Sequence, residues 1–369
     1  REVGLGFNSV AAVDIDERAV EVYVANHGTT PEFVRSGPDG DLANLVDHEL
    51  YGRAETARFL VPPGIKDEAW DALGDGDGVD LLIAGPPCQG HSNLNNHTRR
   101  NDLRNLSYLD VPAVAVALDC PTVIMENVQA VVHDRYQVVS TTRRLFEAAG
   151  YTVTSAALHA GSMGWPQKRS RFFLVASAVN APIPLESVKR QLTVDEGPLD
   201  LWWAISDLED MTEDDHHMFR QANRTAKNRE RIEYLFDHDV HDLPDHQRPP
   251  CHAEGGHTYP AVYGRLHKDR PAPTVTSGFL TTGRGRYVHP TRRRTINPRE
   301  AARLQGFPDD YTFEPTGTRP RSTDLGKWIG DAVPMPLGYA AALSALGNRL
   351  RAGAEDHRSP AERVARWPG

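Results

Sequence analysis

The chain has 369 residues, a formal net charge of −9 at pH 7, and apolar and charged residues at 39% and 25%. These values are typical of a globular protein and exclude collagen, coiled coil and wholesale disorder. No apolar run approaches the roughly 18 residues that a membrane span needs, and no signal-peptide pattern opens the sequence. Three widely spaced cysteines, Cys88, Cys120 and Cys251, argue against a disulfide framework, so we expect a cytoplasmic protein.

The negative charge is unevenly distributed along the chain. Residues 258–303 carry a charge of +8, which leaves −17 on the other residues. A basic segment on an acidic protein favours a localised site for a polyanion, although a solvated charged surface would give the same pattern.

The first half of the sequence alternates short apolar runs with helical patterns. We expect strands over 10–14, 79–84, 121–125, 151–158 and 171–176, and helices over 17–26, 111–118 and 138–149. This alternation predicts an α/β fold with a doubly wound, mostly parallel sheet. In such sheets ligands bind at the carboxyl ends of the strands, which points to Asp14, the loop 86–92 and Glu126.

The second half is less regular. Residues 195–257 are polar, rich in His, Asp and Arg, and only weakly periodic, which predicts a second, smaller domain. Helical patterns return over 297–304 and 336–350, and the final residues lack periodicity. We expect no metal site, because no standard four-ligand spacing fits the group His246, Cys251, His252 and His257.

Cys88 lies in the sequence LLIAGPPCQGHS, directly after a predicted buried strand. A free cysteine is more often a small buried side chain than a nucleophile. A loop at the rim of a sheet is partly exposed, however, and a nearby cation or helix N-terminus would favour the reactive thiolate. Cys88 is therefore the candidate nucleophile, and we expect Cys120 and Cys251 to be structural.

Charged side chains also follow or precede the other predicted strands. Glu126 (IMENV) follows a strand that would bring it beside Cys88, although a helix N-cap or first-turn acid is the alternative interpretation. In GWPQKRSRFFLVA, Gln167, Arg169 and Arg171 would project from one face of an extended strand. Two guanidiniums on one face predict an acceptor such as a carbonyl oxygen or a phosphate.

The segments GPPCQGHS, IMENV, PQKRSR, NPREAARLQGFPDDY and WIGDAVP occur in this order between residues 85 and 334. Together they resemble the DNA (cytosine-5) methyltransferase family, which has a Rossmann-like catalytic domain and a smaller target-recognition domain. The resemblance implies methyl transfer from S-adenosylmethionine to carbon 5 of a cytosine flipped out of double-stranded DNA. It implies a catalytic domain over 1–185, target recognition over 186–290, a segment over 291–350 packing back on the catalytic domain, and a tail over 351–369.

The resemblance also assigns roles to residues. Cys88 matches the nucleophile that attacks carbon 6, and Glu126 matches the acid at ring nitrogen 3, a role that requires a raised pKa. Arg169 and Arg171 match the residues that bind the ring carbonyl and hold the loop geometry. The residues implied for the cofactor are Asp14, Ile15, Pro86, Asp331 and Ala332. The residues implied for DNA contacts are Gln89, Ser92, Arg99, Arg100, Arg292, Arg293 and Arg294.

Departures from the family pattern leave alternatives open. The family's glycine-rich F-x-G-x-G loop, which wraps the methionine part of the cofactor, would fall ahead of Arg1, so we expect an N-terminally truncated sequence. Asp331 stands where the family usually has asparagine, and Asp41 is a weak candidate for the acid that holds the adenine amino group. The alternative functions are a transfer RNA cytosine-5 methyltransferase and a catalytically silent DNA-binding relative.

The expected macromolecular partner is double-stranded DNA. The lack of recognisable regulatory domains favours a bacterial or phage enzyme, with a cognate restriction endonuclease as genetic partner in a restriction-modification system. We expect a monomer that does not bind membranes. The recognition sequence depends on loop geometry within 186–290 and does not follow from the residues.

Overall fold

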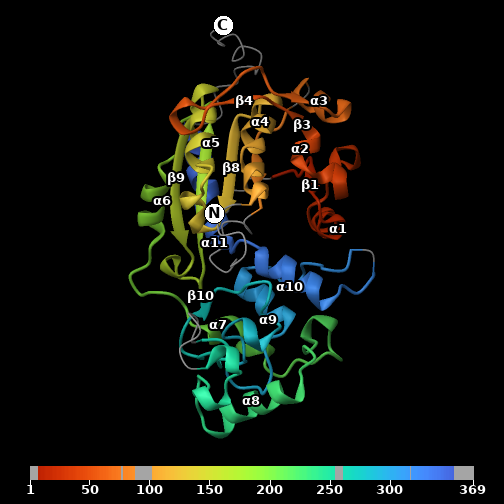
Figure 1. The fold of residues 1–369 in the computed structure, drawn as a ribbon, viewed down its shortest axis with the longest axis vertical. Helices are drawn as coiled ribbons and strands as arrows, with labels where there is room; N and C mark the ends of the chain where they lie inside the picture. Colours follow the sequence, from red (N-terminus) through yellow and green to blue (C-terminus); the bar gives the residue numbers. More distant parts are fainter. Residues whose placement is uncertain (1–6, 76–77, 88–101, 254–260, 316, 353–369) are drawn as a thin grey trace. The chain divides into compact units, whose positions relative to one another are not determined.

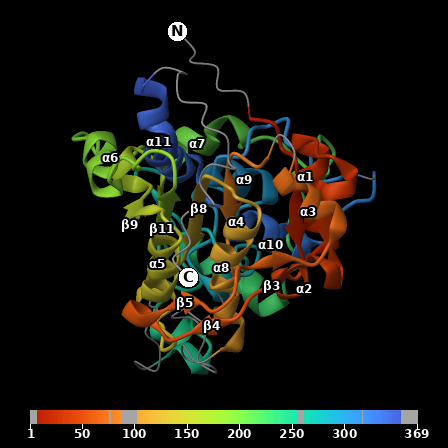
Figure 2. The same ribbon diagram turned by 90° about the horizontal axis from the view of Figure 1, so that it is seen from above.

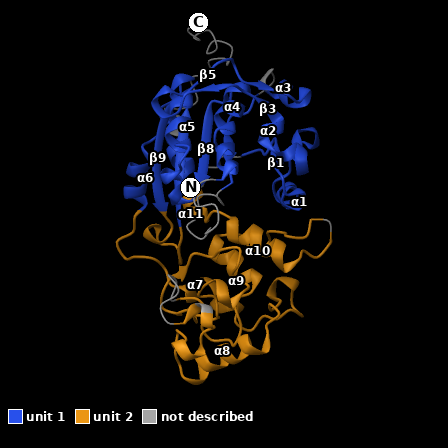
Figure 3. Ribbon diagram, in the orientation of Figure 1, with its two compact units in different colours: residues 1–158, 170–192, 339–369 blue, residues 159–169, 193–338 orange. Residues whose placement is uncertain are grey.

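The computed structural model describes residues 7–75, 78–87, 102–253, 261–315 and 317–352. The chain forms two compact units, which Figure 3 colours separately. Unit 1 comprises residues 1–158, 170–192 and 339–369, and unit 2 comprises residues 159–169 and 193–338. The two units are defined by their compactness and not by their function, so the predicted functional boundaries at residues 185 and 290 stay predictions.

Unit 1 has the predicted α/β organisation (Figure 1). Its strands are β1 (Ala12–Asp14), β2 (Val34–Ser36), β3 (Val46–Asp47), β4 (Leu50–Tyr51), β5 (Arg58–Phe59), β6 (Gly64–Ile65), β7 (Leu82–Ala84), β8 (Thr122–Asn127), β9 (Thr152–His159) and β11 (Ser170–Ser177). Its helices are α1 (Glu17–His27), α2 (Leu42–Leu45), α3 (Glu68–Asp75), α4 (Asp110–Ala117), α5 (Val138–Ala148) and α6 (Leu185–Leu192). The elements predicted in the first half are all present, and those over 34–75 were not predicted.

The main sheet of unit 1 has the strand order β7–β8–β11–β9. β7 is parallel to β8, with Ile83 opposite Ile124, whereas β11 is antiparallel to β8, with Leu174 opposite Met125. A crossover that keeps two strands parallel needs a dozen or more residues. The link 160–169 between β9 and β11 is too short for one, and β11 lies between β8 and β9. The sheet is therefore partly parallel, and less so than the alternation predicted.

Strands β1 and β2 form a separate parallel pair, in which Val13 is opposite Arg35. Among the described residues no strand lies between β1 and β7, and the side chain of Ile83 in β7 is 70% exposed. Helix α4 connects the two sets of strands, because it packs in one apolar cluster with Val13 of β1 and Leu82 of β7. Figure 2 shows α4 between β8 and the segment with α1 and α3.

The core of unit 1 lies between one face of the main sheet and helices α4 and α5. Met125 of β8 and Leu174 of β11 are fully buried there against Val111 of α4 and Phe146 of α5. Successive side chains of a strand point to opposite faces of a sheet. Glu126, the neighbour of Met125, is therefore directed away from this apolar core.

Unit 2 contains less regular structure. Its strands are β10 (Gln167–Lys168) and β12 (Ala272–Pro273), which pair in parallel, and its helices are α7 (Leu201–Ile205), α8 (Ala226–Asp237), α9 (Pro298–Gln305) and α10 (Ser322–Asp331). Helix α11 (Met335–Ala352) begins in unit 2 and ends in unit 1. The predicted helices over 297–304 and 336–350 correspond to α9 and α11. In the part of the chain that the structure describes, no helix is long and apolar enough to cross a membrane.

Helix α10 contacts the main chain of residues 276–277 through a face without side chains. Gly326 and Gly330 lie about one turn apart on this helix. A β-carbon on Gly330 would fall 2.2 Å from the Ser277 nitrogen, and one on Gly326 would fall 2.6 Å from the Ser277 oxygen. Only glycine allows so close an approach, which explains the glycine in the WIGDAVP segment.

Replacing Gly330 by alanine should therefore destabilise the protein, because the new methyl group meets main-chain atoms that cannot move aside independently. We expect the free energy of unfolding to fall by roughly 1–3 kcal/mol. Gly338→Ala in α11 is the matched control, since a β-carbon there meets nothing within 4 Å. That variant should gain about 0.5–1 kcal/mol from its helix propensity. Urea denaturation checks both, and equal effects of the two variants would contradict the packing described here.

Candidate active site

Three predicted segments of unit 1 meet at one edge of the main sheet. Because β7 and β8 are parallel, Pro86 after β7 and Glu126 at the end of β8 lie at the same edge. β11 is antiparallel to β8, so its second residue, Arg171, also lies there. The strand directions alone thus place a carboxylate and a guanidinium beside the loop that leads to Cys88.

Glu126 and Arg171 form an ion pair across the two strands. Glu126 is directly opposite Phe173, and Arg171 precedes Phe173 by two residues, so both charged side chains project from the same face. Arg171 Nε lies 2.7 Å from Glu126 Oε1, and the two side chains are 14% and 17% exposed. This arrangement holds one carboxyl group in a fixed, mostly buried position with an edge open to solvent.

The end of β8 also holds the loop after β7. The Asn127 side chain donates a hydrogen bond of 3.1 Å to the Pro86 carbonyl. A β-carbon on Gly85 would lie 3.8 Å from Glu126 Oε2, so the loop passes close to this carboxyl group. Residues 88–101 lie outside the described residues, and with them the predicted site residues Cys88, Gln89, Ser92, Arg99 and Arg100.

Cys120 has the environment of a structural cysteine, as expected. Its side chain is fully buried, and its thiol donates a hydrogen bond of 3.3 Å to the Thr122 carbonyl. Burial raises the pKa of the Cys120 thiol to about 12, so almost no thiolate forms at neutral pH. The side chain of Cys251 lies outside the described part of the structure.

The predicted cofactor residues of unit 1 lie at the end of β1. Asp14 is exposed, and its Oδ1 accepts a hydrogen bond of 2.8 Å from the Asp16 nitrogen. The Ile15 side chain is 64% exposed, which leaves an apolar surface beside that carboxylate. Asp41, in contrast, is the N-cap of α2 and accepts a hydrogen bond of 3.1 Å from the Ala43 nitrogen. Its side chain therefore already has a local structural role.

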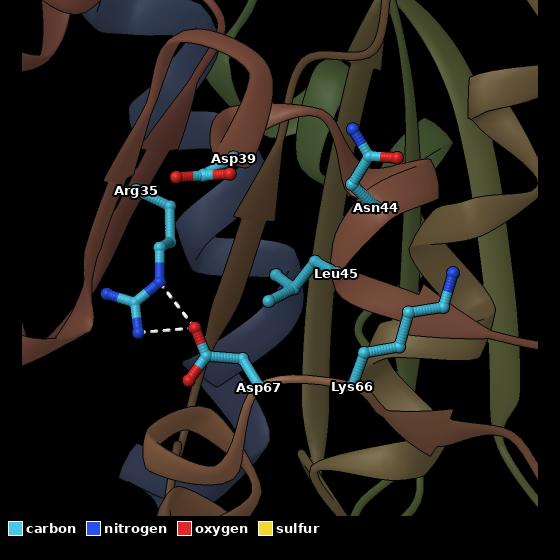
Figure 4. Close-up of a pocket in the computed structure, with 6 residues that line it drawn as sticks. All are labelled: Arg35, Asp39, Asn44, Leu45, Lys66 and Asp67. Atoms are coloured by element: carbon cyan, nitrogen blue, oxygen red, sulfur yellow. Dashed lines mark hydrogen bonds and ion pairs between the residues drawn. The ribbon is translucent and has the colours of Figure 1, made fainter.

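Unit 1 also contains a polar pocket of about 310 Å³ that was not predicted (Figure 4). Its lining residues are Arg35, Asp39, Asn44, Leu45, Lys66 and Asp67. Arg35 Nε donates a hydrogen bond of 2.5 Å to Asp67 Oδ2, and Lys66 Nζ lies 3.0 Å from Asp47 Oδ1. Burial opposes ionisation of Asp67, but the hydrogen bond and charge of Arg35, together with hydrogen bonds from the main-chain nitrogens of Trp70 and Ala69, outweigh it and lower the pKa of Asp67. The two cations of the pocket thus already have carboxylate partners.

Gln167 and Arg169 share a face, as predicted, but Arg171 belongs to a different unit. Both unit 2 side chains are buried and bind Val275, whose nitrogen donates to Gln167 Oε1 (3.0 Å) and whose carbonyl accepts from Arg169 Nη1 (2.6 Å). The strand is interrupted between β10 and β11, so the three side chains do not project together. The acceptors of Arg169 are main-chain carbonyls of its own unit.

The same side chains hold the predicted cofactor segment after α10. Arg169 Nη2 donates to the carbonyls of Gly330 (3.0 Å) and Asp331 (3.3 Å). Gln305 Nε2 donates to the carbonyl of Ala332 at 3.2 Å. The main chain at the predicted cofactor residues Asp331 and Ala332 is thus fixed by two buried side chains of unit 2.

Acidic side chains of unit 2 neutralise most of the basic segment 258–303. The ion pairs join Arg265 to Asp239, Arg286 to Asp242, Arg292 to Glu209 and Asp210, Arg293 to Glu233 and Asp237, and Arg303 to Asp207 and Asp309. These acids lie outside the basic segment, most of them well before it in the sequence, which is why counting charges along the chain suggested an unpaired polyanion site. The excess of +8 in the segment is largely internal to the unit.

Arg294 does not fit the predicted contact with DNA, because it is 8% exposed and bound to a buried carboxylate. Its Nη1 and Nη2 donate to Glu300 at 2.8 and 2.6 Å, and His289 Nε2 lies 3.4 Å from the same side chain. Burial opposes ionisation of Glu300, but these hydrogen bonds outweigh it and lower its pKa to about 2. Arg292 and Arg293 are each 44% exposed, so a phosphate could still reach them.

Among the described residues, no three His, Cys, Asp or Glu side chains come close enough together to hold a metal ion. His246 instead packs edge to face against Tyr234, with ring centroids 6.0 Å apart, and His252 packs in the same way against Tyr263. His257 lies outside the described residues. The expectation of no metal site therefore stays a prediction for the chain as a whole.

Comparison with known proteins gives a consistent set of relatives. A family model described as C-5 cytosine-specific DNA methylase matches residues 62–346. The Type II methyltransferase M1.BsuMI of Bacillus subtilis (strain 168) is 36% identical over 348 residues, which cover 94% of this chain and 75% of that protein. DNA (cytosine-5)-methyltransferase 3 of Arabidopsis thaliana is 27% identical over 332 residues, covering 74% of this chain and 23% of the plant protein.

Solved structures show the same fold at lower identity. A DNA modification methyltransferase encoded within an E. coli prophage has a TM-score of 0.58 and 22% identity, and the match covers 94% of each chain. The S. pombe Dnmt2 methyltransferase has a TM-score of 0.54 and 17% identity, covering 92% of this chain and 91% of that one. These likenesses concern the fold alone.

The buried carboxylate in unit 2 leads to a prediction about stability and pH. Glu300→Gln leaves Arg294 buried without its counter-charge, so the free energy of unfolding at pH 7 should fall by about 3–5 kcal/mol. Glu233→Gln is the control, because its ion pair with Arg293 is half exposed and contributes about 1 kcal/mol or less.

The free energy of unfolding should also depend on pH differently in the wild type and in Glu300→Gln. The folded pKa of Glu300, about 2, lies below the ordinary value of 4.5, so its stabilisation is complete above pH 4.5 and disappears as the pH falls toward 2. Urea denaturation across this window should show a loss about 3 kcal/mol smaller in Glu300→Gln than in the wild type. An equally steep acid limb in both proteins would contradict the assignment.

Proposed function

The chain belongs to the C-5 cytosine-specific DNA methylase family, and on that premise we propose how its residues carry out the family's reaction. The reaction is methyl transfer from S-adenosylmethionine to carbon 5 of cytosine in DNA. The observation that carries the assignment of residues is the Glu126–Arg171 pair beside the loop that leads to Cys88. Here the predicted acid and the predicted guanidinium meet beside the described residues that lead to the predicted nucleophile.

Cys88 is the proposed nucleophile. Cytosine carbon 5 is a poor nucleophile, and addition of the Cys88 thiolate to carbon 6 makes it electron-rich. Cys120, with its pKa raised to about 12, is unsuited to this role. The rigid sequence Pro86–Pro87 and the hydrogen bond from Asn127 restrain the main chain immediately before Cys88.

Glu126 is the proposed acid at ring nitrogen 3. Addition of the thiolate moves negative charge into the ring, and Glu126 in its protonated form would donate the proton or hydrogen bond to nitrogen 3 that stabilises this charge. Arg171 fixes the position of Glu126 through the 2.7 Å contact and is the proposed donor to the ring carbonyl. When bound, S-adenosylmethionine supplies the methyl group that carbon 5 takes up. Loss of the carbon 5 proton and cleavage of the carbon–sulfur bond then regenerate the Cys88 thiolate.

Arg169 is proposed as a positioning residue. Its buried guanidinium binds the carbonyls of Val275, Gly330 and Asp331, which ties both terminal nitrogens to the main chain of unit 2. Its proposed part is to hold the segment with Asp331 and Ala332 in shape. The family resemblance allowed Arg169 either to bind the ring carbonyl or to hold the loop geometry, and we propose the second role.

The residues at the end of β1 fit the adenosine part of the cofactor. An exposed carboxylate such as that of Asp14 accepts hydrogen bonds from ribose hydroxyls, and the exposed Ile15 side chain offers an apolar contact to adenine. Pro86, Asp331 and Ala332 are the other proposed cofactor contacts. Asp14 and Ile15 are both exposed, so adenosine could contact them without moving a buried charge.

Double-stranded DNA is the proposed substrate, with the target base flipped out of the duplex. Gln89, Ser92, Arg99 and Arg100 stay proposed DNA contacts, and Arg292 and Arg293 are proposed only as exposed cations that could exchange an acid for a phosphate. The Type II names of several relatives support a restriction-modification system with a cognate endonuclease. We further propose a monomer that acts on DNA in the cytoplasm.

Two cysteine variants test the proposed nucleophile. Cys88→Ala should lower methyl transfer to duplex DNA by at least about 10³-fold, because the proposed covalent adduct at carbon 6 needs the Cys88 thiolate. Cys120→Ala should leave the rate of transfer nearly unchanged. The measurement is incorporation of labelled methyl groups into duplex DNA and, in parallel, into transfer RNA. Activity of Cys88→Ala would refute the mechanism, and a preference of the wild type for transfer RNA would refute the substrate.

A substitution at the end of β1 tests the cofactor site. Asp14→Asn loses charge-assisted hydrogen bonds to the ribose, so the KM for S-adenosylmethionine should rise roughly 10-fold or more with kcat little changed. Glu21→Gln, at an exposed position of α1, removes the same charge as a control. Initial rates at varied cofactor concentration check the split between KM and kcat. A fall in kcat alone would contradict the assignment.

A further inference from the structure

Two arginines of unit 2 differ from the paired arginines of the basic segment. Nε and Nη2 of Arg220 and Nη1 of Arg299 are buried and make no hydrogen bond within the described residues. The side chain of Arg299 is 9% exposed, and its nearest paired carboxylate oxygen, on Asp309, is 3.9 Å away. A buried guanidinium N–H without an acceptor is costly, so these donors point to an acceptor that binds there.

The two arginines belong to one cluster of basic side chains. The 3₁₀ helix His217–Phe219, directly before Arg220, packs against α9, which carries Arg299 near its start. The rings of His216 and His217 are 4.1 Å apart, and His217 Nε2 lies 3.4 Å from Glu314 Oε1. Arg319 completes the cluster and, with 57% exposure, is an accessible cation of the group.

The carboxylates near this cluster leave the buried donors of Arg220 and Arg299 without an acceptor. Asp309 is already bound through both oxygens by Arg303, and Glu213 lies 3.4 Å from Arg319. Burial first, and then the neighbouring cations, lower the pKa of His217 to about 4, so His217 is uncharged at pH 7 and forms no ion pair with Glu314. Burial likewise lowers the pKa of Arg220. The nearby carboxylates of Glu213, Glu314 and Asp324 raise it, but by less.

We propose that Arg220, Arg299 and Arg319 form a phosphate-binding site in unit 2, which takes a phosphodiester of the DNA backbone. A phosphate offers several acceptor oxygens and a full negative charge, which matches several guanidinium donors better than one further carboxylate would. The contact is independent of sequence and would position unit 2 on the duplex. The inference rests on the proposed function, because DNA is the polymer that brings the phosphate.

The accessible member of the cluster provides the entry. The 3.4 Å contact of Arg319 with Glu213 is half exposed and weak, so Arg319 can turn toward an arriving phosphate at little cost. The buried donors of Arg220 and Arg299 gain their acceptor once the side chains close around it. The proposed site therefore forms by a small local adjustment in a part of unit 2 that already holds the three guanidinium groups.

Salt dependence of DNA binding tests the site in the full-length chain. Each phosphate contact adds about 0.9 to the slope of log Kd against log salt concentration. Arg220→Gln and Arg319→Gln should each lower the slope by about 1 and weaken binding roughly 5-fold at about 50 mM salt. Arg144→Gln, at an exposed position of α5 in unit 1, is the charge-matched control and should leave the slope unchanged.

Three further measurements separate the explanations. Arg220→Lys restores the charge and should recover most of the slope, whereas loss of fold would not respond to it, and Arg319 is too exposed for its substitution to unfold the protein. If inorganic phosphate raises the melting temperature of the wild type alone while all slopes are equal, the site takes free phosphate and the DNA assignment is overturned. Equal slopes without any effect of phosphate overturn the site altogether. Methyl transfer by the wild type is assayed separately, so a failure of the proposed function is recognised independently.

Discussion

The reversal of β11 against β8 is the constraint on which the candidate site depends. A parallel β11 would carry Arg171 to the opposite edge of the sheet from Glu126. Because the link 160–169 is too short for a helical crossover, β11 returns antiparallel and places its first residues where β8 ends. The alternation of side chains along β8 then sets the face on which Glu126 lies. Met125 is buried in the core, so Glu126 points to the other face of the sheet. One short link thereby unites a carboxyl group and a guanidinium that are far apart in the sequence.

Unit 2 carries many arginines, and ion pairs with its acidic side chains limit their non-specific attraction to polyanions. Its basic segment pairs mostly with acids from the preceding part of the unit, and the exposed pairs such as Arg292 with Asp210 are weak enough to exchange. The buried pair of Arg294 with Glu300 is of another kind, because separating it would leave a charge in a dry environment. Exposed pairs can thus tune affinity for a polyanion, whereas the buried pair maintains the shape of the segment before α9. Charge along the sequence does not distinguish these two uses.

Much of unit 1 could be predicted from the sequence, and the reasons are local. Apolar runs and helical periodicity identified β8, α5 and β11. Glu126 was expected beside Cys88, which lies outside the described residues, and the structure has Glu126 near Gly85 of the same loop. The pairing partners could not be predicted in the same way. Arg169 was grouped with Arg171 by its spacing, but the strand breaks between them and the guanidinium binds Val275 instead. The acids that neutralise the basic segment, and the orphaned donors of Arg220 and Arg299, depend on contacts between residues that no sequence spacing relates.

The segment from Gln167 to Arg171 shows why one motif serves both units. Two of its side chains, Gln167 and Arg169, are buried and hold Val275, and Arg169 also holds the main chain after α10. The third, Arg171, binds Glu126 at the sheet edge. A change of register by one residue would turn the buried guanidinium toward solvent and remove the partner of the carboxylate at the same time. Two requirements therefore fix the spacing of the motif. The contacts of Gln167 and Arg169 inside unit 2 require it, and so does the contact of Arg171 with Glu126 in unit 1.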